Sequence, residues 1–323
     1  MTTTPQSNTD PAAIRRAAEE IASVAGGLLQ ELYAGPLDVR YKARRGDRDP
    51  VTVADEEVER LVRREVAARF PGHAVLGEEA GGDDAAVLWV VDPLDGTANF
   101  ANGLPIFACS IGVLHDGAPL AAAVYTTFGP EGRACVLSAD RDGPLRLDGE
   151  SWAPHPRDVR ERARLAGVPA GFRYRFRHGW LGTLPPGETR SLGSIAVELV
   201  LVATDTLHYA VFSGPRIWDV AGGVLLCQQA GRLVLTREGR RWRRLDRFTT
   251  IQDKPLREWS APVIAGDPRA LRAIAPRLGV RRHPLELAEA LIGYRRTRAI
   301  LRVGGHAVDL AQRLRQRSHI RHG

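Results

Sequence analysis

Three acidic turns follow apolar segments of the chain, and together they could bind metal ions. Residues 89–100 read WVVDPLDGTANF, so an apolar run leads directly to Asp92 and Asp95. Glu78 ends a shorter apolar run, and Asp219 begins a helical pattern. Because ligands of α/β folds bind at the carboxyl ends of strands, these acids can meet at one sheet edge. Carboxylates without neighbouring His or Cys favour hard cations such as Mg²⁺.

A Gly-Thr pair follows the acids and could bind phosphate. Gly96 lets the backbone approach a ligand closely, and N–H groups at a helix start bind anions. The Thr97 hydroxyl could orient a water molecule, and Asp55 in VTVAD could accept that hydroxyl's hydrogen bond. Asp55 and Asp219 could each instead be a simple helix N-cap. The three acidic turns taken together favour the chemical interpretation.

Composition narrows the class of protein. The chain has 323 residues, of which 44% are hydrophobic, which is enough for a packed core and for two domains. Its three cysteines lack CxxC spacing, so we expect no disulfide framework and a cytoplasmic protein. The first residues, MTTTPQSNTDP, contain no apolar segment. We therefore expect no signal peptide, and no apolar run is long enough to predict a membrane span.

Apolar periodicity and turn residues predict a mixed chain of helices and strands. We expect a disordered N-terminus over 1–10, an α+β domain with the acidic turns over 11–150, an α/β domain that completes the site over 151–280, and a basic helical extension over 281–323. The predicted helices cover 12–33, 51–70, 195–203, 217–230 and 268–278, and the predicted strands cover 73–76, 87–91, 106–114, 119–127, 208–212, 233–235 and 261–265, with a turn at DPLDGT.

Several motifs resemble those of the inositol monophosphatase family. The segment 89–100 resembles its first signature, and WDVAGGVLLCQQAG at 218–231 resembles its second. The segments LGEE, PVTVAD and RSLGSIAVELVLVAT at 76–79, 50–55 and 190–204 also match in order and spacing. The resemblance covers about residues 12–270. It implies a layered αβαβα sandwich of the inositol monophosphatase and fructose-1,6-bisphosphatase type, and a Mg²⁺-dependent, Li⁺-sensitive phosphomonoesterase that forms homodimers.

The resemblance assigns roles to individual residues. Glu78, Asp92 and the main-chain carbonyl of Leu94 correspond to ligands of a first Mg²⁺. Asp92, Asp95 and Asp219 correspond to ligands of a second, and a third ion would depend on Glu78, so two to three ions are expected. Glu78, Thr97 and Asp55 correspond to the catalytic group that positions the attacking water. The expected substrate contacts are Asp95, Gly96, Thr97, Gly193, Ser194, Ile195 and Phe212.

The residues at the positions where family members contact the substrate differ from the family pattern. Phe212 stands where inositol-specific members have an acid, Leu207 and His208 replace an Ala-Asp pair, and Ile195 replaces a small residue. These differences argue against myo-inositol phosphate itself and leave fructose-1,6-bisphosphatase and histidinol phosphatase as alternatives. Ala98 argues against a 3′-phosphoadenosine 5′-phosphate phosphatase, in which a lysine directly follows DGT.

Arginine-rich segments raise two further alternatives. Arg173, Arg175 and Arg177 could neutralise a second phosphate, although one solvated strand face is the favoured interpretation. The segment 281–323 holds ten arginines and three acids, which admits a non-catalytic phosphate- or nucleic-acid-binding protein. With Tyr294 as its one aromatic residue and no recognised motif, it argues against nucleic acid. Its apolar residues favour packing on the body of the protein or on a partner subunit.

Overall fold

The computed structural model describes residues 9–35, 39–41, 50–154, 159–160, 163–172, 176–178, 187–249 and 255–280. The predictions for residues 1–8 and for the basic segment 281–323 therefore lie outside the described residues. So do those for Arg173, Arg175 and the side chain of Arg177. No helix within the described ranges is long and apolar enough to cross a membrane.

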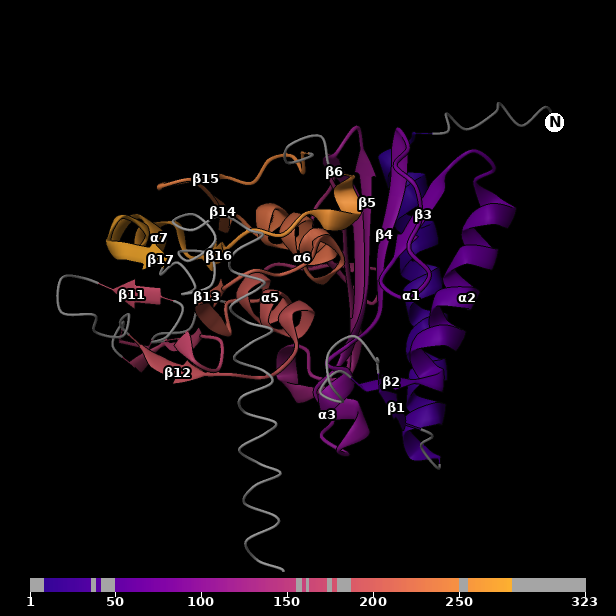
Figure 1. The fold of residues 1–323 in the computed structure, drawn as a ribbon, viewed down its shortest axis with the longest axis horizontal. Helices are drawn as coiled ribbons and strands as arrows, with labels where there is room; N and C mark the ends of the chain where they lie inside the picture. The colour runs from indigo at the N-terminus through magenta and orange to yellow at the C-terminus, as the bar shows by residue number, and fades with distance from the viewer. Residues whose placement is uncertain are drawn as a thin grey trace, which may run out of the picture.

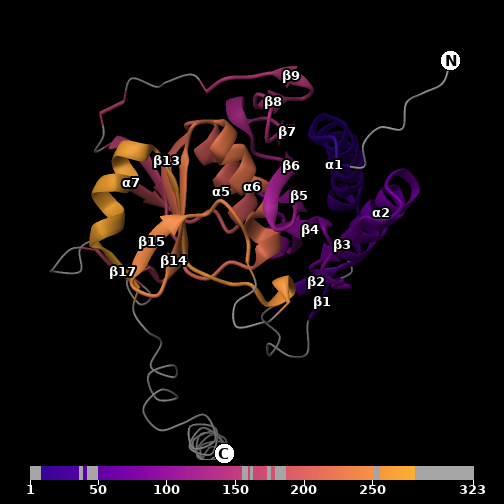
Figure 2. The same ribbon diagram turned by 90° about the horizontal axis from the view of Figure 1, so that it is seen from above.

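The elements form five alternating layers, as predicted (Figures 1 and 2). Two helices cover one outer face, a seven-stranded sheet follows, two helices lie between the sheets, and a six-stranded sheet is covered by a last helix. Each layer buries an apolar face against its neighbour, which is the usual reason for layered architectures. The helices of these layers are α1 (Pro11–Ala34) and α2 (Val53–Arg69), then α5 (Ile195–Ala203) and α6 (Ile217–Gln229), then α7 (Pro268–Ile274).

The first sheet contains most of the acidic turns. Its order is β3-β4-β5-β6-β7-β8-β9, with β3 parallel to β4 and the other neighbours antiparallel. The strands predicted over 106–114 and 119–127 pair as a hairpin, and its turn uses positive φ at Asp116 and Gly117. The strands are β3 (Ala74–Gly77), β4 (Val87–Asp95), β5 (Ala108–His115), β6 (Ala118–Thr126), β7 (Cys135–Asp140), β8 (Arg146–Leu147) and β9 (Glu150–Ser151).

One prediction in this sheet was wrong in its boundary. The turn was expected directly after Val91, but β4 continues through Pro93 to Asp95. The pairing with β5 shifts register between Asp92 and Asp95, which pair with Ser110 and Ala108. The extra residue forms a bulge at Pro93, which has no N–H to give to the ladder. The bulge keeps both carboxylates on an ordered strand.

The second sheet has the order β12-β10-β13-β16-β14-β15. Its strands are β10 (Leu165–Gly167), β12 (Glu188–Arg190), β13 (Leu207–Phe212), β14 (Leu233–Glu238), β15 (Arg241–Arg244) and β16 (Val263–Gly266). The strand predicted over 233–235 is longer and forms a hairpin with β15. Smaller elements are β1 (Val39–Tyr41), β2 (Pro50–Thr52), α3 (Thr97–Ala101), η2 (Pro130–Gly132), β11 (Phe176–His178) and η4 (Leu256–Glu258).

The predicted helix over 268–278 is shorter than expected. α7 ends at Ile274, and a 3₁₀ turn, η5 (Ala275–Arg277), leads to β17 (Leu278–Val280), which pairs with β11. Pro276 explains the early end, because its ring nitrogen cannot donate the helical hydrogen bond to residue 272.

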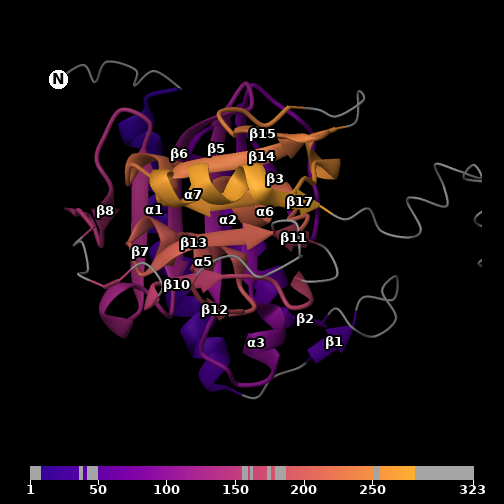
Figure 3. The ribbon, with the colours of Figure 1, turned by 90° about the vertical axis from the view of Figure 1, so that its left-hand side faces the viewer.

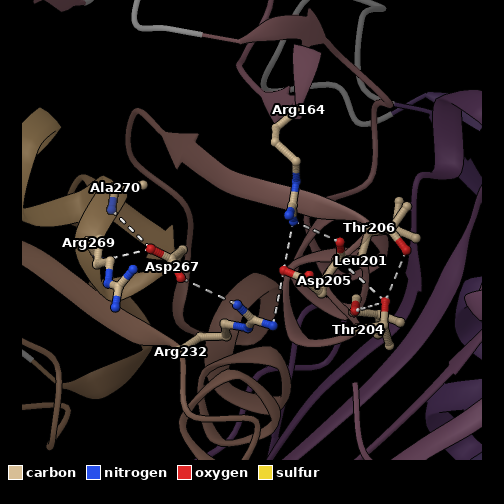
Figure 4. A network of polar contacts seen from close by, with 10 residues as sticks. Arg164, Leu201, Thr204, Asp205, Thr206, Arg232, Asp267, Arg269 and Ala270 are labelled. Carbon is tan, nitrogen blue, oxygen red and sulfur yellow. Dashed lines mark hydrogen bonds and ion pairs between the residues drawn. The ribbon is translucent and has the colours of Figure 1, made fainter. Parts of the chain in front are cut away.

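A buried polar network connects the inner helices to the second sheet (Figure 4). Asp205 follows α5 with a φ of 62°, and its Oδ1 lies 2.7 Å from Arg164 Nη2 and 3.1 Å from Arg232 Nη2. Arg232 follows α6 and also approaches Asp267, the N-cap of α7, at 3.8 Å. One carboxylate with two guanidinium partners therefore connects the C-terminal ends of α5 and α6.

Candidate active site

α2 holds the turn that presents Glu78. The buried carboxylate of Glu59 on α2 accepts hydrogen bonds from the backbone N–H groups of Glu79 (2.9 Å) and Ala80 (3.1 Å). Arg63 lies one helical turn further along and contacts Glu59 Oε1 at 2.7 Å. A Cβ at Gly77 would lie 2.3 Å from the Glu59 carboxyl carbon, so the turn and helix pack without room for a larger residue. Glu59 was not predicted as a site residue.

The four predicted acidic ligands line one cavity of about 530 Å³. The cavity lies where the ends of β3, β4 and β13 meet the N-terminal ends of α5 and α6. Its lining also includes every other predicted metal or substrate residue, whereas Asp55 is not among the lining residues. The lining residues are Glu78, Asp92, Leu94, Asp95, Gly96, Thr97, Ala98, Pro169, Ala170, Ser191, Gly193, Ser194, Ile195, Glu198, Phe212, Ser213, Gly214, Pro215 and Asp219.

Asp92 is the most enclosed of the acids, with 2% of its surface exposed. Burial raises its pKa well above the ordinary value, and the neighbouring carboxylates of Glu78, Asp95 and Asp219 raise it further. Its Oδ1 accepts a hydrogen bond from Leu94 N–H at 3.1 Å, which fixes the carboxylate within the β4 bulge. A buried acid surrounded by acids is unfavourable when ionised, and a bound cation would relieve that cost.

Asp95 connects the first sheet to α5. Its Oδ2 accepts hydrogen bonds from the Ser194 hydroxyl, at 2.8 Å, and from Ala196 N–H. Burial raises the pKa of Asp95 to about 6, and these two hydrogen bonds oppose the rise. Ser194 is itself the N-cap of α5 and accepts from Val197 N–H at 3.3 Å. The predicted substrate loop thus bonds directly to a predicted metal ligand.

Asp219 lies in the first turn of α6, and it is not the N-cap residue, which is Arg216. Its Oδ2 accepts a hydrogen bond from Arg216 N–H at 2.7 Å. Burial, followed by the charge of Asp95, raises the pKa of Asp219 to about 8. The simple N-cap interpretation is therefore wrong in its position, and the side chain faces the acid cavity while it satisfies a helix N–H.

The Gly96-Thr97 turn is shaped for close approach. Gly96 has a φ of 94°, and a Cβ there would lie 2.9 Å from Ile106 O. The Thr97 hydroxyl lies 2.9 Å from Leu94 O and 3.4 Å from Asp55 Oδ1. Because a hydroxyl has one proton, it donates to one of these oxygens at a time, and the shorter contact is to Leu94. The predicted Thr97–Asp55 pair is present in the structure, with Asp55 buried.

The donor set fits a hard cation. The predicted ligands supply only oxygen, which Mg²⁺ prefers over nitrogen or sulfur. Across the described ranges, no three His, Cys, Asp or Glu side chains are already close enough to enclose a metal ion. The carboxyl groups of Asp95 and Asp219 instead accept hydrogen bonds from the helix starts. Both residues accept these hydrogen bonds through Oδ2, so the hydrogen bonds leave Oδ1 of each carboxylate unoccupied by these donors.

The second half of the chain supplies the opposite wall of the cavity. Gly193 has a φ of 78°, and a Cβ there would lie 3.0 Å from Asn99 Oδ1, whose amide group donates to Leu192 O at 2.8 Å. Ile195 and Phe212 present apolar surface, and Phe212 is also part of the core between the sheets. Phe212, expected as a substrate contact, therefore belongs to the core and also lines the cavity.

Glu198 was not predicted, although it faces the same cavity. Burial raises its pKa to about 7, and its Oε1 accepts from Leu192 N–H at 2.9 Å. The Pro169-Ala170 and Ser213–Pro215 segments were also missed. Each follows a strand of the second sheet, so Pro and Gly residues after an apolar strand were the available signal.

Comparison with known proteins agrees with this site. The model of the inositol monophosphatase family matches residues 10–258. "Phosphatase IMPL1, chloroplastic" of Arabidopsis thaliana is 32% identical over 281 residues, which are 82% of this chain and 71% of that protein. "Inositol-1-monophosphatase SuhB" of Mycobacterium tuberculosis is 34% identical over 249 residues, which are 70% of this chain and 84% of that protein.

Solved structures show the same fold. A SuhB protein of Bartonella henselae matches with a TM-score of 0.64 at 24% identity, covering 81% of this chain and 98% of that one. Mycobacterium tuberculosis SuhB matches with a TM-score of 0.58 at 28% identity, covering 82% and 98%. The fold and the relatives of this chain identify the protein as a hydrolase of phosphate monoesters. The chain belongs to the inositol monophosphatase family.

Proposed function

We propose that this phosphatase hydrolyses the phosphate monoester of a small polyol or sugar, and that it requires Mg²⁺. The observation that carries the proposal is the convergence of Glu78, Asp92, Asp95 and Asp219 on one cavity beside the Gly96-Thr97 turn. A phosphate monoester dianion repels a nucleophile, and divalent cations overcome that repulsion. The Mycobacterium tuberculosis relative named above as an inositol-1-monophosphatase supports the same reaction class.

The proposed metal ligands are the four carboxylates and the Leu94 carbonyl, for two to three Mg²⁺ ions. Bound Mg²⁺ would neutralise phosphate charge and make a bound water more acidic. The N–H groups of Gly96 and Thr97, at the start of α3, would donate to phosphate oxygens. The Thr97 hydroxyl, within reach of Asp55, would orient the attacking water, and Glu78 would hold the water's far side.

The opposite wall would receive the alcohol part of the substrate. Ser194 and Gly193 would present polar groups from the α5 start, and Ile195 and Phe212 would contact carbon atoms. This apolar pair favours a substrate with fewer hydroxyl contacts than myo-inositol phosphate. A bisphosphate is the second candidate, because a relative from Aquifex aeolicus, 28% identical, carries the name "Fructose-1,6-bisphosphatase/inositol-1-monophosphatase".

The decisive experiment measures inorganic phosphate released from a panel of sugar, polyol and histidinol phosphates. We expect turnover with Mg²⁺, loss with EDTA and inhibition by Li⁺. Asp92→Asn should abolish turnover while Asp246→Asn, an exposed acid paired only with Arg244 among the described residues, should retain it. Turnover that persists in EDTA, or in Asp92→Asn, would exclude the metal mechanism.

Three further predictions extend the proposal beyond the active site. The family resemblance predicts a homodimer, and the unpaired cysteine pattern predicts a cytoplasmic location. The division into domains at 11–150 and 151–280 also stays a prediction. Light scattering of the purified chain would test the dimer.

A further inference from the structure

A second cavity, of about 850 Å³, lies away from the candidate active site. Its lining residues come from the β14–β15 hairpin and from α7, η5 and β17. Figure 3 shows α7 and β17 beside that hairpin. α7 covers the outer face of the second sheet, opposite α5 and α6 (Figure 2). The two cavities share no lining residue. This second cavity, here called the arginine groove, is lined by Leu233, Leu235, Arg237, Arg240, Arg241, Trp242, Leu271, Arg272, Ala275, Pro276, Arg277, Leu278 and Gly279.

The groove concentrates positive charge without acidic partners. It contains five arginines and no acid, and within the described part of the chain none of the five forms an ion pair. Arg243 and Arg244 on the same hairpin differ, because they pair with Glu238 at 3.0 Å and Asp246 at 3.3 Å. Unpaired guanidinium groups around a concave surface attract an anion and suit phosphate oxygens in particular.

Arg237 and Trp242 form a fixed wall of the groove. The Arg237 guanidinium carbon lies 5.4 Å from the centroid of the Trp242 ring. Arg237 Nη1 and Trp242 Nε1 both donate to Leu278 O, at 2.9 Å and 3.1 Å. Burial lowers the pKa of Arg237. A guanidinium partly removed from water without an acidic partner is costly, and a bound anion would offset that cost.

The floor of the groove is apolar. Leu235, Leu271, Ala275 and Leu278 belong to the buried cluster beneath α7, and Trp242 packs against it. A ligand that fills the groove must therefore combine several negative charges with an apolar or aromatic body. The volume lies within the range of about 300–1,000 Å³ that is typical of small-ligand sites.

We propose that the arginine groove binds a nucleoside diphosphate or a closely similar nucleotide. The base would lie on the apolar floor beside Trp242, and the phosphates would contact the exposed Arg240, Arg272 and Arg277. The chain's own segment 281–323 is a poor occupant, although it continues directly from β17. It holds ten arginines and three acids, so it would add like charge to the groove. An inorganic polyanion would leave the apolar floor uncovered.

Calorimetry of the full-length protein with ADP, in EDTA, tests the proposal without metal at the active site. The double variant Arg272→Gln/Arg277→Gln should weaken ADP binding by about tenfold or more, the range for two lost phosphate contacts. Arg243→Gln/Arg244→Gln removes the same charge from the same region and should change affinity by less than about twofold. Both variants should retain phosphatase activity.

The Trp242→Leu variant tests the contact with the nucleotide base separately from the contacts between phosphates and arginines. It should weaken ADP binding and leave inorganic tripolyphosphate binding unchanged. Three results would overturn the proposal: no ADP binding at millimolar concentration, equal losses in the groove variant and its charge-matched control, or tripolyphosphate binding as tightly as ADP. ADP binding that the groove variants leave unchanged would place the nucleotide elsewhere, the catalytic cavity included, and would also overturn it.

Discussion

Replacing Asp219 with asparagine should stabilise the metal-free protein while it disables the enzyme. The pKa of Asp219 rises from 3.8 to about 8 because the side chain is buried and faces Asp95. An acid whose pKa rises on folding binds more protons in the folded than in the unfolded state between those two values. The free energy of unfolding therefore falls as the pH rises from about 4 to about 8. Asparagine removes that dependence and keeps an oxygen to accept from Arg216 N–H.

The size of the effect follows from the shift. Each pKa unit corresponds to about 1.4 kcal/mol, so at pH 7 the cost of Asp219 has an upper limit of about 4 kcal/mol. The side chain is partly exposed at the cavity, and solvent reduces the cost to about 1–3 kcal/mol. For a protein of this size we expect Asp219→Asn in EDTA to raise Tm by roughly 3–8 °C near pH 7.5. Near pH 4 the two proteins should be about equally stable.

Thermal unfolding at both pH values, with EDTA or with Mg²⁺, measures this directly. Mg²⁺ should raise the Tm of the native protein near pH 7.5 and raise that of Asp219→Asn less, since one ligand charge is gone. Activity should fall by about a hundredfold or more, because Asp219 is a proposed metal ligand and even residues that only support ligands cost about 10–100-fold when mutated. Asp246→Asn provides the control. Destabilisation of Asp219→Asn in EDTA near pH 7.5, or the same stability change at both pH values, would refute the reasoning.

Three other substitutions test the surroundings of the site. Glu59→Gln should lower kcat by about tenfold or more, because its carboxylate orients the turn of Glu78 through Glu79 N–H, and a panel assay of phosphate release measures it. Gly96→Ala should destabilise the fold by about 1–3 kcal/mol in urea unfolding, because it places a Cβ 2.9 Å from Ile106 O at positive φ. Asp205→Asn, which tolerates the same backbone conformation, should cost about 3 kcal/mol by leaving two arginines without their shared carboxylate, and unchanged Tm would contradict that role.

The long helices and the acidic strand ends could be predicted because their signals are local. Asp10 caps α1, and apolar residues recur along one face of that helix, so its boundaries agree closely with prediction. Ile195–Ala203 was predicted residue for residue, since Ser194 is a good N-cap. Non-local pairing was harder to see. The strand β15 reads RWRR, and this sequence does not alternate apolar and polar residues as a typical strand does. It forms a strand because it pairs with β14, which no local pattern indicates.

Glu59 and Glu198 were not predicted as site residues for a different reason. Glu59 lies within a helix of charged residues, and its spacing alone resembles an ordinary solvated i, i+4 pair with Arg63. Its burial arises only because the Glu78 turn packs against that helix face. Glu198 lies in the most apolar helix of the site, and its role depends on the Leu192 N–H that the preceding loop aims at it. The positions of both residues in the site depend on tertiary contacts with distant segments, and no local sequence pattern indicates such contacts.

The sources of charge and of hydrogen-bond donors explain how the site is assembled. Glu78, Asp92 and Asp95 come from the first sheet, whereas the donors that face Asp95, Ser194 Oγ and Ala196 N–H, come from the start of α5. Each half alone would leave either crowded acids or unsatisfied helix N–H groups, and both are unfavourable. Packing the halves together gives Asp95 two donors and gives the start of α5 an acceptor, while the crowding of the acids remains. The cavity is therefore formed by the same interaction that joins the two sheets, and a cation at that place would strengthen the joint as well as the chemistry.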